Sequence, residues 1–174
     1  QAKTLFPYTT LFRSIYNLPE KAHVEGGDVV LLNDTVFVGL YTGADYSQLK
    51  TARTNLYAFH FLEELFPDKT LVPLELRKHD TDPRQCVLHL DCAFMPVSTD
   101  KVILYKDGFS NTTDYEMLVE RFGKKNVFEI TQEEMYFMNA NIFSISPTVV
   151  VSENRFTRLN NHMENEWGLT VERI

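Results

Sequence analysis

The sequence predicts an α/β protein in which copies of one strand–strand–helix–strand module pack around a common axis. The first observation is a repeat: β-rich runs, turns and amphipathic helices recur in the same order over about residues 25–76, 89–130 and 139–174. The second is that one such module cannot bury both faces of its own sheet, so several must pack together with their helices outside. Because three modules are too few to close a ring, we expect further modules before residue 15 and after residue 174. An ordinary α/β domain with one mixed sheet is the alternative.

The first module is predicted from two β-rich runs, a helix and a closing strand. The β-rich runs lie at residues 28–32 and 36–40, on either side of a turn. Residues 52–66 predict a helix because their apolar side chains recur at helical spacing, and Pro67 ends it. Residues 70–76 form the expected closing strand.

The second module repeats this order with clearer helix signals. Thr113 and Glu116 have the spacing of a capping box, which opens a helix that ends at Gly123. The strands of this module are expected at residues 90–95, 101–105 and 126–130.

The third module is preceded by a second capping box, Thr131 and Glu134, for a short helix over residues 133–138. A longer helix is expected over residues 156–167, where Gly168 stops it. The strands of this module are expected at residues 142–145, 149–151 and 170–174.

Composition narrows the possible partners. A net charge of −7 argues against nucleic acid, which needs a basic surface, but an acidic pocket would attract a small cation. No apolar run reaches the roughly 18 residues of a membrane span, so we expect no membrane partner. The two cysteines, Cys86 and Cys92, make no disulfide framework and indicate a reducing, cytoplasmic location.

The N-terminal segment is interpreted separately. Residues 4–14 read TLFPYTTLFRS, which matches one reading frame of a widely used sequencing-library adapter. We therefore expect residues 1–14 to be a translated artefact and to form no domain. An apolar leader is the alternative, although Pro7, Arg13 and three threonines interrupt any signal-peptide core.

Unusual residues gather where each module begins. Glu25-Gly26-Gly27-Asp28 precedes the first strand of module one, His89-Leu90-Asp91 that of module two, and Asn139-Ala140-Asn141 that of module three. In a ring of equivalent modules these positions converge near the axis. We therefore expect residues that are far apart in sequence to form one site.

The residue types in this group fit an amino acid with a guanidino or ureido end. A histidine with a carboxylate behind it is a competent general acid and base. A second carboxylate, Asp91, can form bidentate hydrogen bonds to a planar guanidinium. Arg53, at the start of the predicted first helix, can bind a substrate carboxylate.

Each motif taken alone has a plainer explanation. Glu-Gly-Gly-Asp is more often a surface turn, His-x-Asp a polar strand end, and Arg53 a solvated helix residue. His60 lies between Phe59 and Phe61, where packing explains it. No cluster has the spacing of metal ligands, so we expect neither a metal nor a cofactor. The prediction of a site rests on the order of the motifs and their position at module starts.

Five segments, in the right order, resemble the amidinotransferase and dimethylargininase-like family of guanidine-modifying enzymes, the superfamily that includes arginine deiminase. They are VEGGDVV (24–30), ARTN (52–55), LHLDCAF (88–94), NANIFSIS (139–146) and VVVSENRFTRLN (149–160). The resemblance implies an α/β-propeller (pentein) of five strand–strand–helix–strand modules. Residues 15–174 would then be a partial propeller domain holding about three of the five.

The resemblance also implies a chemistry. In that family a cysteine thiolate attacks the guanidinium carbon, an amine departs and a covalent thiouronium intermediate forms. By resemblance, His89 is the general acid and base and Glu25 the carboxylate that orients it. Asp91 and Arg53 are then ligands of the substrate guanidinium and carboxylate, and Asp28 is expected among the substrate-binding residues.

The nucleophile is expected in a segment shortly beyond residue 174. Cys92 adjoins the His89-Leu90-Asp91 motif, but alternation along a strand places its side chain on the opposite face from Asp91. Neither Cys92 nor Cys86 is therefore expected to be the nucleophile.

Three functions stay open at this point. The first is a C–N hydrolase for arginine, methylarginine or citrulline, favoured because water needs no second binding site. The second is an amidinotransferase. The third is a non-catalytic propeller that only binds, as in a ribosome-binding translation factor of the same architecture. The expected partner is a small guanidino or ureido amino acid, and a homodimer is compatible with the prediction.

Overall fold

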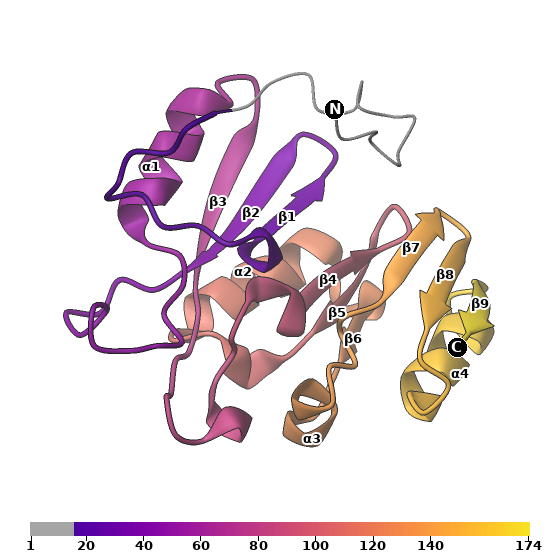
Figure 1. Ribbon diagram of the computed structural model, residues 1–174. Helices are drawn as coiled ribbons and strands as arrows, with labels where there is room; N and C mark the ends of the chain where they lie inside the picture. The colour runs from indigo at the N-terminus through magenta and orange to yellow at the C-terminus, as the bar shows by residue number, and fades with distance from the viewer. Residues whose placement is uncertain (1–15) are drawn as a thin grey trace, which may run out of the picture.

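The computed structural model describes residues 16–174, which form three small sheets with helices packed against them (Figure 1). Each sheet holds three strands in sequence order, an antiparallel pair followed by a parallel pair. A helix joins the second strand to the third, because a parallel partner requires a crossover connection. The expected artefact at residues 1–14 lies outside the described residues.

The elements follow the same order in each unit. The first unit comprises β1 (Val29–Leu32), β2 (Thr35–Leu40), α1 (Leu56–Leu65) and β3 (Thr70–Glu75). The second comprises β4 (Phe94–Val97), β5 (Lys101–Leu104), α2 (Thr112–Phe122) and β6 (Val127–Glu129). After the short helix α3 (Gln132–Tyr136), the third comprises β7 (Phe143–Ser146), β8 (Val149–Ser152), α4 (Thr157–Asn165) and β9 (Thr170–Arg173).

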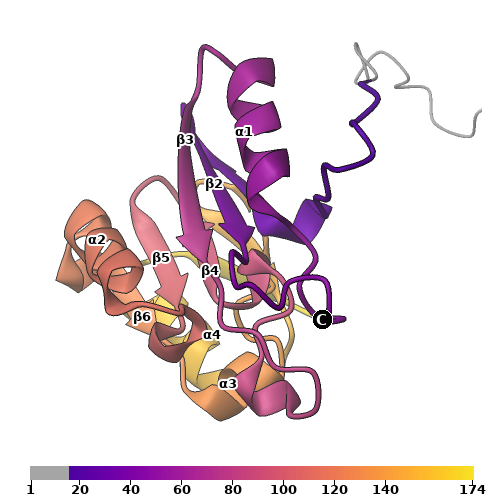
Figure 2. The same cartoon turned by 90° about the vertical axis from the view of Figure 1, so that its left-hand side faces the viewer.

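Strand β2 is buried on both faces and therefore contributes to two packed layers. Because side chains alternate along a strand, one face meets α1, which lies along this sheet in Figure 2. The residues of this outer layer are Val36, Val38, Leu40, Phe59 and Leu62.

The opposite face of β2 packs against the second unit. Phe37 and Phe94 are both 0% exposed, and their ring centroids lie 4.7 Å apart. Phe94 also meets Phe122 of α2, with centroids 6.0 Å apart. The same apolar cluster continues into the third unit through Leu159 and Met163 of α4. One continuous core therefore holds the three sheets together.

Helix boundaries follow local capping chemistry. The Thr131–Glu134 capping box is present at the start of α3, as predicted. Gly123 ends α2 with a φ of 77°, a conformation that glycine adopts without strain. The predicted Thr113–Glu116 box is wrong, because Asn111 caps α2 by accepting from the Asp114 backbone N–H.

Two further boundaries differ from the prediction. Helix α1 begins at Leu56 with Asn55 as its cap, so residues 52–55 precede the helix and Arg53 does not lie in it. The predicted strand over residues 90–95 begins instead as a 3-10 turn, Leu90–Cys92, and becomes strand only at Phe94. Alternation along a strand therefore does not apply to Asp91 and Cys92.

Candidate active site

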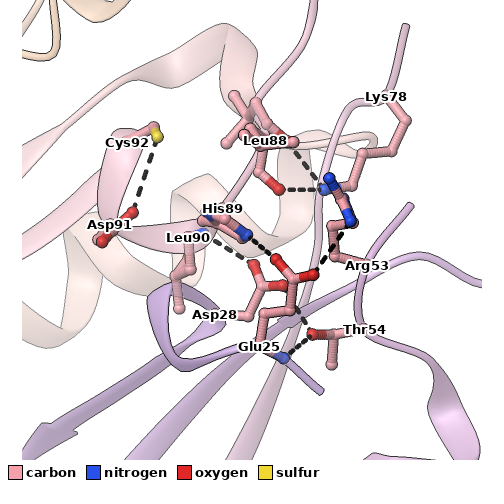
Figure 3. A network of polar contacts seen from close by, with 11 residues as sticks. Glu25, Asp28, Arg53, Thr54, Lys78, Leu88, His89, Leu90, Asp91 and Cys92 are labelled. Atoms are coloured by element: carbon pink, nitrogen blue, oxygen red, sulfur yellow. Dashed lines mark hydrogen bonds and ion pairs between the residues drawn. The ribbon is translucent and has the colours of Figure 1, made fainter. Parts of the chain in front are cut away.

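Glu25 lies at the centre of a polar cluster where the first and second units meet (Figure 3). Its Oε2 accepts a hydrogen bond from His89 Nε2 at 2.5 Å, and its Oε1 accepts one from Arg53 Nη1 at 3.1 Å. Arg53 and His89 lie 28 and 64 residues away from Glu25 in sequence. The structure thus brings Glu25, Arg53 and His89 together from distant parts of the sequence.

Backbone geometry explains how His89 reaches Glu25. His89 is extended, with φ −133° and ψ 161°, immediately before the Leu90–Cys92 turn. Gly27 faces it closely: a Cβ on Gly27 would lie 2.9 Å from His89 Cβ and Cγ. Because real Cβ atoms do not approach so near, any side chain at position 27 would displace the imidazole. The second glycine of the Glu-Gly-Gly-Asp motif thus makes room for the histidine.

Asp28 is not placed like a ligand of an external substrate. It is 0% exposed, its Oδ2 accepts from Thr54 Oγ1 at 2.6 Å, and its Oδ1 accepts from the Leu90 backbone N–H at 2.9 Å. Burial raises the pKa of this carboxyl, opposed by the two hydrogen bonds. Both oxygens are thus occupied inside the protein, which favours a supporting position over the expected substrate contact.

Lys78 is a member of the cluster that the sequence interpretation missed. Its Nζ donates to the backbone carbonyls of Val87 and Leu88, at 2.9 and 2.8 Å, directly before His89. Burial lowers the pKa of Lys78, while the nearby Asp28 carboxylate opposes that change. No motif marked this lysine, since its partners are carbonyl groups that any sequence supplies. It holds the segment that presents His89.

Asp91 and Cys92 lie apart from the Glu25–His89–Arg53 cluster in the close view (Figure 3). The Cys92 thiol points to the Asp91 carboxylate, at 3.7 Å, and to Met138 Sδ, at 3.8 Å. Burial raises the pKa of Cys92 to about 11, so the reactive thiolate is scarce at neutral pH. Cys86 is also a free, buried cysteine. Neither thiol is prepared as a nucleophile in this structure.

An open hollow lies beside the cluster. Glu25 and Arg53 form part of its wall, and the segment around His23 and the loop around Tyr46 form another part. The His23 ring stacks on Tyr46, and His23 Nδ1 lies 3.1 Å from the Tyr46 hydroxyl. A small solute can therefore reach the Glu25–Arg53 pair from this side.

The third unit contributes less to the site than expected from its position in the repeat. The backbone N–H of Asn139 bonds to the Glu134 carbonyl, and that of Asn141 to the Met138 carbonyl, so both belong to the turn after α3. Its connection to the site motif is the contact between Met138 and Cys92. The polar cluster is thus built from the first two units.

His60 and His79 have local explanations. His60 is exposed and pairs with Glu63 at 2.8 Å, so the expected explanation by packing is wrong. His79 accepts the Asp82 backbone N–H at 2.9 Å in a polar connection.

Within residues 16–174, no group of three or more His, Cys, Asp or Glu side chains is arranged to hold a metal ion. Across that same range, no helix is both long and apolar enough to cross a membrane.

Two hydrogen-bonded carboxylates, one of them in the cluster, predict a loss of stability in acid. The hydrogen bond from His89 lowers the pKa of Glu25, and bonds from the Lys50 and Thr51 backbone lower that of Asp80. When the folded-state pKa lies below the unfolded one, the stability gained is complete above the unfolded pKa and is lost as pH falls through the folded one. Asp28 acts in the opposite direction: because its pKa is raised in the folded state, its contribution to the free energy of unfolding grows as the pH falls.

We expect the free energy of unfolding to fall as pH drops below about 4, the range of unperturbed carboxyl groups. Urea unfolding measured between pH 7 and pH 3 checks this result. Glu25→Gln and Asp80→Asn should each flatten part of the pH profile, because each removes one titrating group. A profile that is flat in the unmodified chain would contradict the assigned pKa changes.

One family model matches most of the chain. The family model for eukaryotic N,N-dimethylarginine dimethylhydrolase matches residues 8–167. The protein YkgA of Bacillus subtilis (strain 168) is 29% identical over 129 residues, which cover 74% of this chain and 38% of YkgA. This chain therefore spans well under half the length of that curated relative.

Solved structures show the same fold at low identity. The product-bound N-terminal domain of ArgZ, a cyanobacterial arginine dihydrolase, has a TM-score of 0.72 at 18% identity, covering 92% of this chain and 52% of that one. The dimethylarginine dimethylaminohydrolase of Pseudomonas aeruginosa with citrulline has a TM-score of 0.66 at 18% identity, covering 90% and 50%. The α/β fold with open mixed sheets is thus similar to that of these enzymes. With the family model matching most of its length, the chain belongs to the N,N-dimethylarginine dimethylhydrolase family.

Proposed function

We propose that the full-length protein is a C–N hydrolase that acts on a guanidino or ureido amino acid of the arginine, methylarginine or citrulline type. The observation that carries the proposal is the Glu25–His89 hydrogen bond at 2.5 Å with Arg53 beside it. A carboxylate-bound imidazole next to an open hollow is suited to general acid–base work. Family membership supports this substrate class, as do two structural relatives, one a product-bound arginine dihydrolase and the other complexed with citrulline.

The proposed reaction has two steps. A cysteine thiolate attacks the guanidinium carbon, and the C–N bond breaks as His89 donates a proton to the departing amine. His89 then takes a proton from water, which attacks the thiouronium carbon, and the C–S bond breaks to regenerate the thiolate. Glu25 keeps the imidazole oriented in both steps, because His89 Nε2 donates to it in this structure.

The other residues of the proposed site bind the substrate. Asp91, partly exposed at the turn before β4, pairs with the guanidinium, and Arg53 binds the α-carboxylate. Arg53 Nη1 donates to Glu25 Oε1, and we propose that the substrate carboxylate competes with Glu25 for this guanidinium.

We further propose that the complete protein is a five-module α/β-propeller and that these 174 residues hold three of the modules. The nucleophilic cysteine then lies outside them, which agrees with the burial of both Cys86 and Cys92. The same proposal predicts that residues 15–174 alone bind substrate weakly and turn none over.

The test is an activity assay of the full-length protein with arginine, dimethylarginine and citrulline, following release of amine or ammonia. Residues 15–174 alone are the matched control. We expect turnover by the full-length protein, with water as acceptor, and none by the control. Product that appears only when a second amine is added would favour the amidinotransferase. Absence of turnover with retained binding would favour the non-catalytic propeller.

A further inference from the structure

The three side chains of the candidate site are connected through one buried carboxylate. Asp28 Oδ1 accepts from the backbone N–H of Leu90, the residue after His89. Asp28 Oδ2 accepts from the hydroxyl of Thr54, the residue after Arg53. That hydroxyl in turn accepts from the backbone N–H of Glu25 at 3.2 Å. The hydrogen-bonded pair Asp28–Thr54 therefore touches each of the three segments that carry the site.

Burial restricts the movement of the Asp28–Thr54 pair. Asp28 is 0% and Thr54 1% exposed, so no bulk water replaces a bond that is lost. An unpaired buried polar group costs about 1–3 kcal/mol, and more when it is charged. Gly39 adds to the confinement, because a Cβ on it would lie 3.0 Å from Asp28 Oδ1. The carboxylate has little freedom to move, and neither have its partners.

We propose that Asp28 and Thr54 are positioning residues that fix Glu25, Arg53 and His89 relative to one another across the junction of the first two units. The inference rests on the proposed function for its catalytic meaning. Its geometric content stands separately, because the Glu25–His89 bond can be observed without turnover. Neither residue touches substrate in this assignment: both act through the backbone of their neighbours.

Thr54 offers a matched pair of substitutions. Thr54→Val keeps the shape but removes the hydroxyl, which leaves the Glu25 N–H and Asp28 Oδ2 without their partner. Thr54→Ser loses a methyl group but keeps the hydroxyl. Thr35→Val is the control, since Thr35 is also buried and its hydroxyl accepts from Arg121 at 2.6 Å, in β2 away from the site cluster.

The first readout is the imidazole proton that His89 donates to Glu25, observed by NMR in the chain labelled with ¹⁵N-histidine. A proton in so short a hydrogen bond is expected downfield of the amide protons. We expect its resonance to be lost or moved in Thr54→Val and kept in Thr54→Ser and Thr35→Val. If Thr54→Val does not fold, Asp28→Asn is the second variant: with its oxygen accepting from the Leu90 N–H, its NH2 group takes the place of Oδ2 and cannot accept the Thr54 proton.

The second readout is kcat in the full-length protein. A displacement of about 1 Å at a reacting group can cost about 10²-fold in rate, so we expect kcat to fall between 10-fold and 100-fold in Thr54→Val. Thr54→Ser should restore most of this loss, and Thr35→Val should leave kcat unchanged. An unmoved histidine resonance in folded Thr54→Val would overturn the proposal, as would an equal change in Thr35→Val. If the resonance responds as expected but no variant turns over substrate, the positioning assignment stands and the proposed function fails.

Discussion

Replacement of His89 by alanine in the full-length protein should lower kcat by about 10²–10⁴-fold, the usual contribution of a positioned proton-transfer group. Its imidazole is bonded to Glu25 at 2.5 Å and is assigned both the departing amine and the incoming water. No chemical step then proceeds well without it. Steady-state kinetics with an arginine-like substrate measure the loss.

Arg53→Ala and Asp91→Asn are the matched comparisons. Arg53 is assigned to the far end of the substrate, where its contact is similar in the ground and transition states, so its loss should raise KM more than it lowers kcat. Asp91→Asn should lower kcat by an amount between those of His89→Ala and Arg53→Ala, because Asp91 is assigned to the guanidinium itself. If His89→Ala kept a near-normal kcat, this site assignment would be wrong and the binding-module alternative would be the better one.

The order of strands and helices was predictable from the sequence because each signal is local. Hydrophobic periodicity predicted α1, and capping and turn chemistry predicted the end of α2 at Gly123 and the start of α3 after Thr131. The wrong cap of α2 shows the limit of such signals. Asn111 and Thr113 are both good cap residues, and the sequence alone does not tell which one adopts the extended backbone that a cap requires.

The prediction of a strand over residues 90–95 was wrong for a different reason. Its apolar run is compatible with a strand, but the Leu90 N–H bonds to Asp28 of another unit instead of to a neighbouring strand. Gly39 permits this approach, because a Cβ there would lie 2.7 Å from Leu90 Cβ. A tertiary contact thus decides the local conformation, and no window along the chain contains that information.

The candidate site divides in the same way. Glu25 and His89 could be singled out from the sequence because their motifs have a chemical meaning that can be interpreted without coordinates, and the structure brings these two side chains together. Lys78 and Thr54 were not, because they bond to backbone groups and each residue type is common in unremarkable positions. The sequence alone therefore does not reveal which residues hold the reactive side chains in place.

Phe94→Ala should cost about 3–5 kcal/mol in the free energy of unfolding, the usual range for a buried phenylalanine. Phe94 is 0% exposed and packs between Phe37 of the first unit and Phe122 of α2. Its removal leaves a cavity at the junction on which the Glu25–His89 bond depends. Urea unfolding of the chain measures the cost, and the histidine resonance should broaden with it.

Phe143→Ala is the control and also a test of the proposed five-module propeller. Phe143 lies in β7 and is 68% exposed, with Ile145 of the same strand 58% exposed. In this chain the substitution should change the free energy of unfolding by no more than about 0.5 kcal/mol, as is usual at the surface. In a five-module propeller a further unit would cover this strand, so the same substitution should cost several times more in the full-length protein. Equal, small costs in both proteins would mean that β7 stays uncovered and that the ring proposal is wrong, whereas a large cost in this chain alone would mean that Phe143 is already buried by self-association.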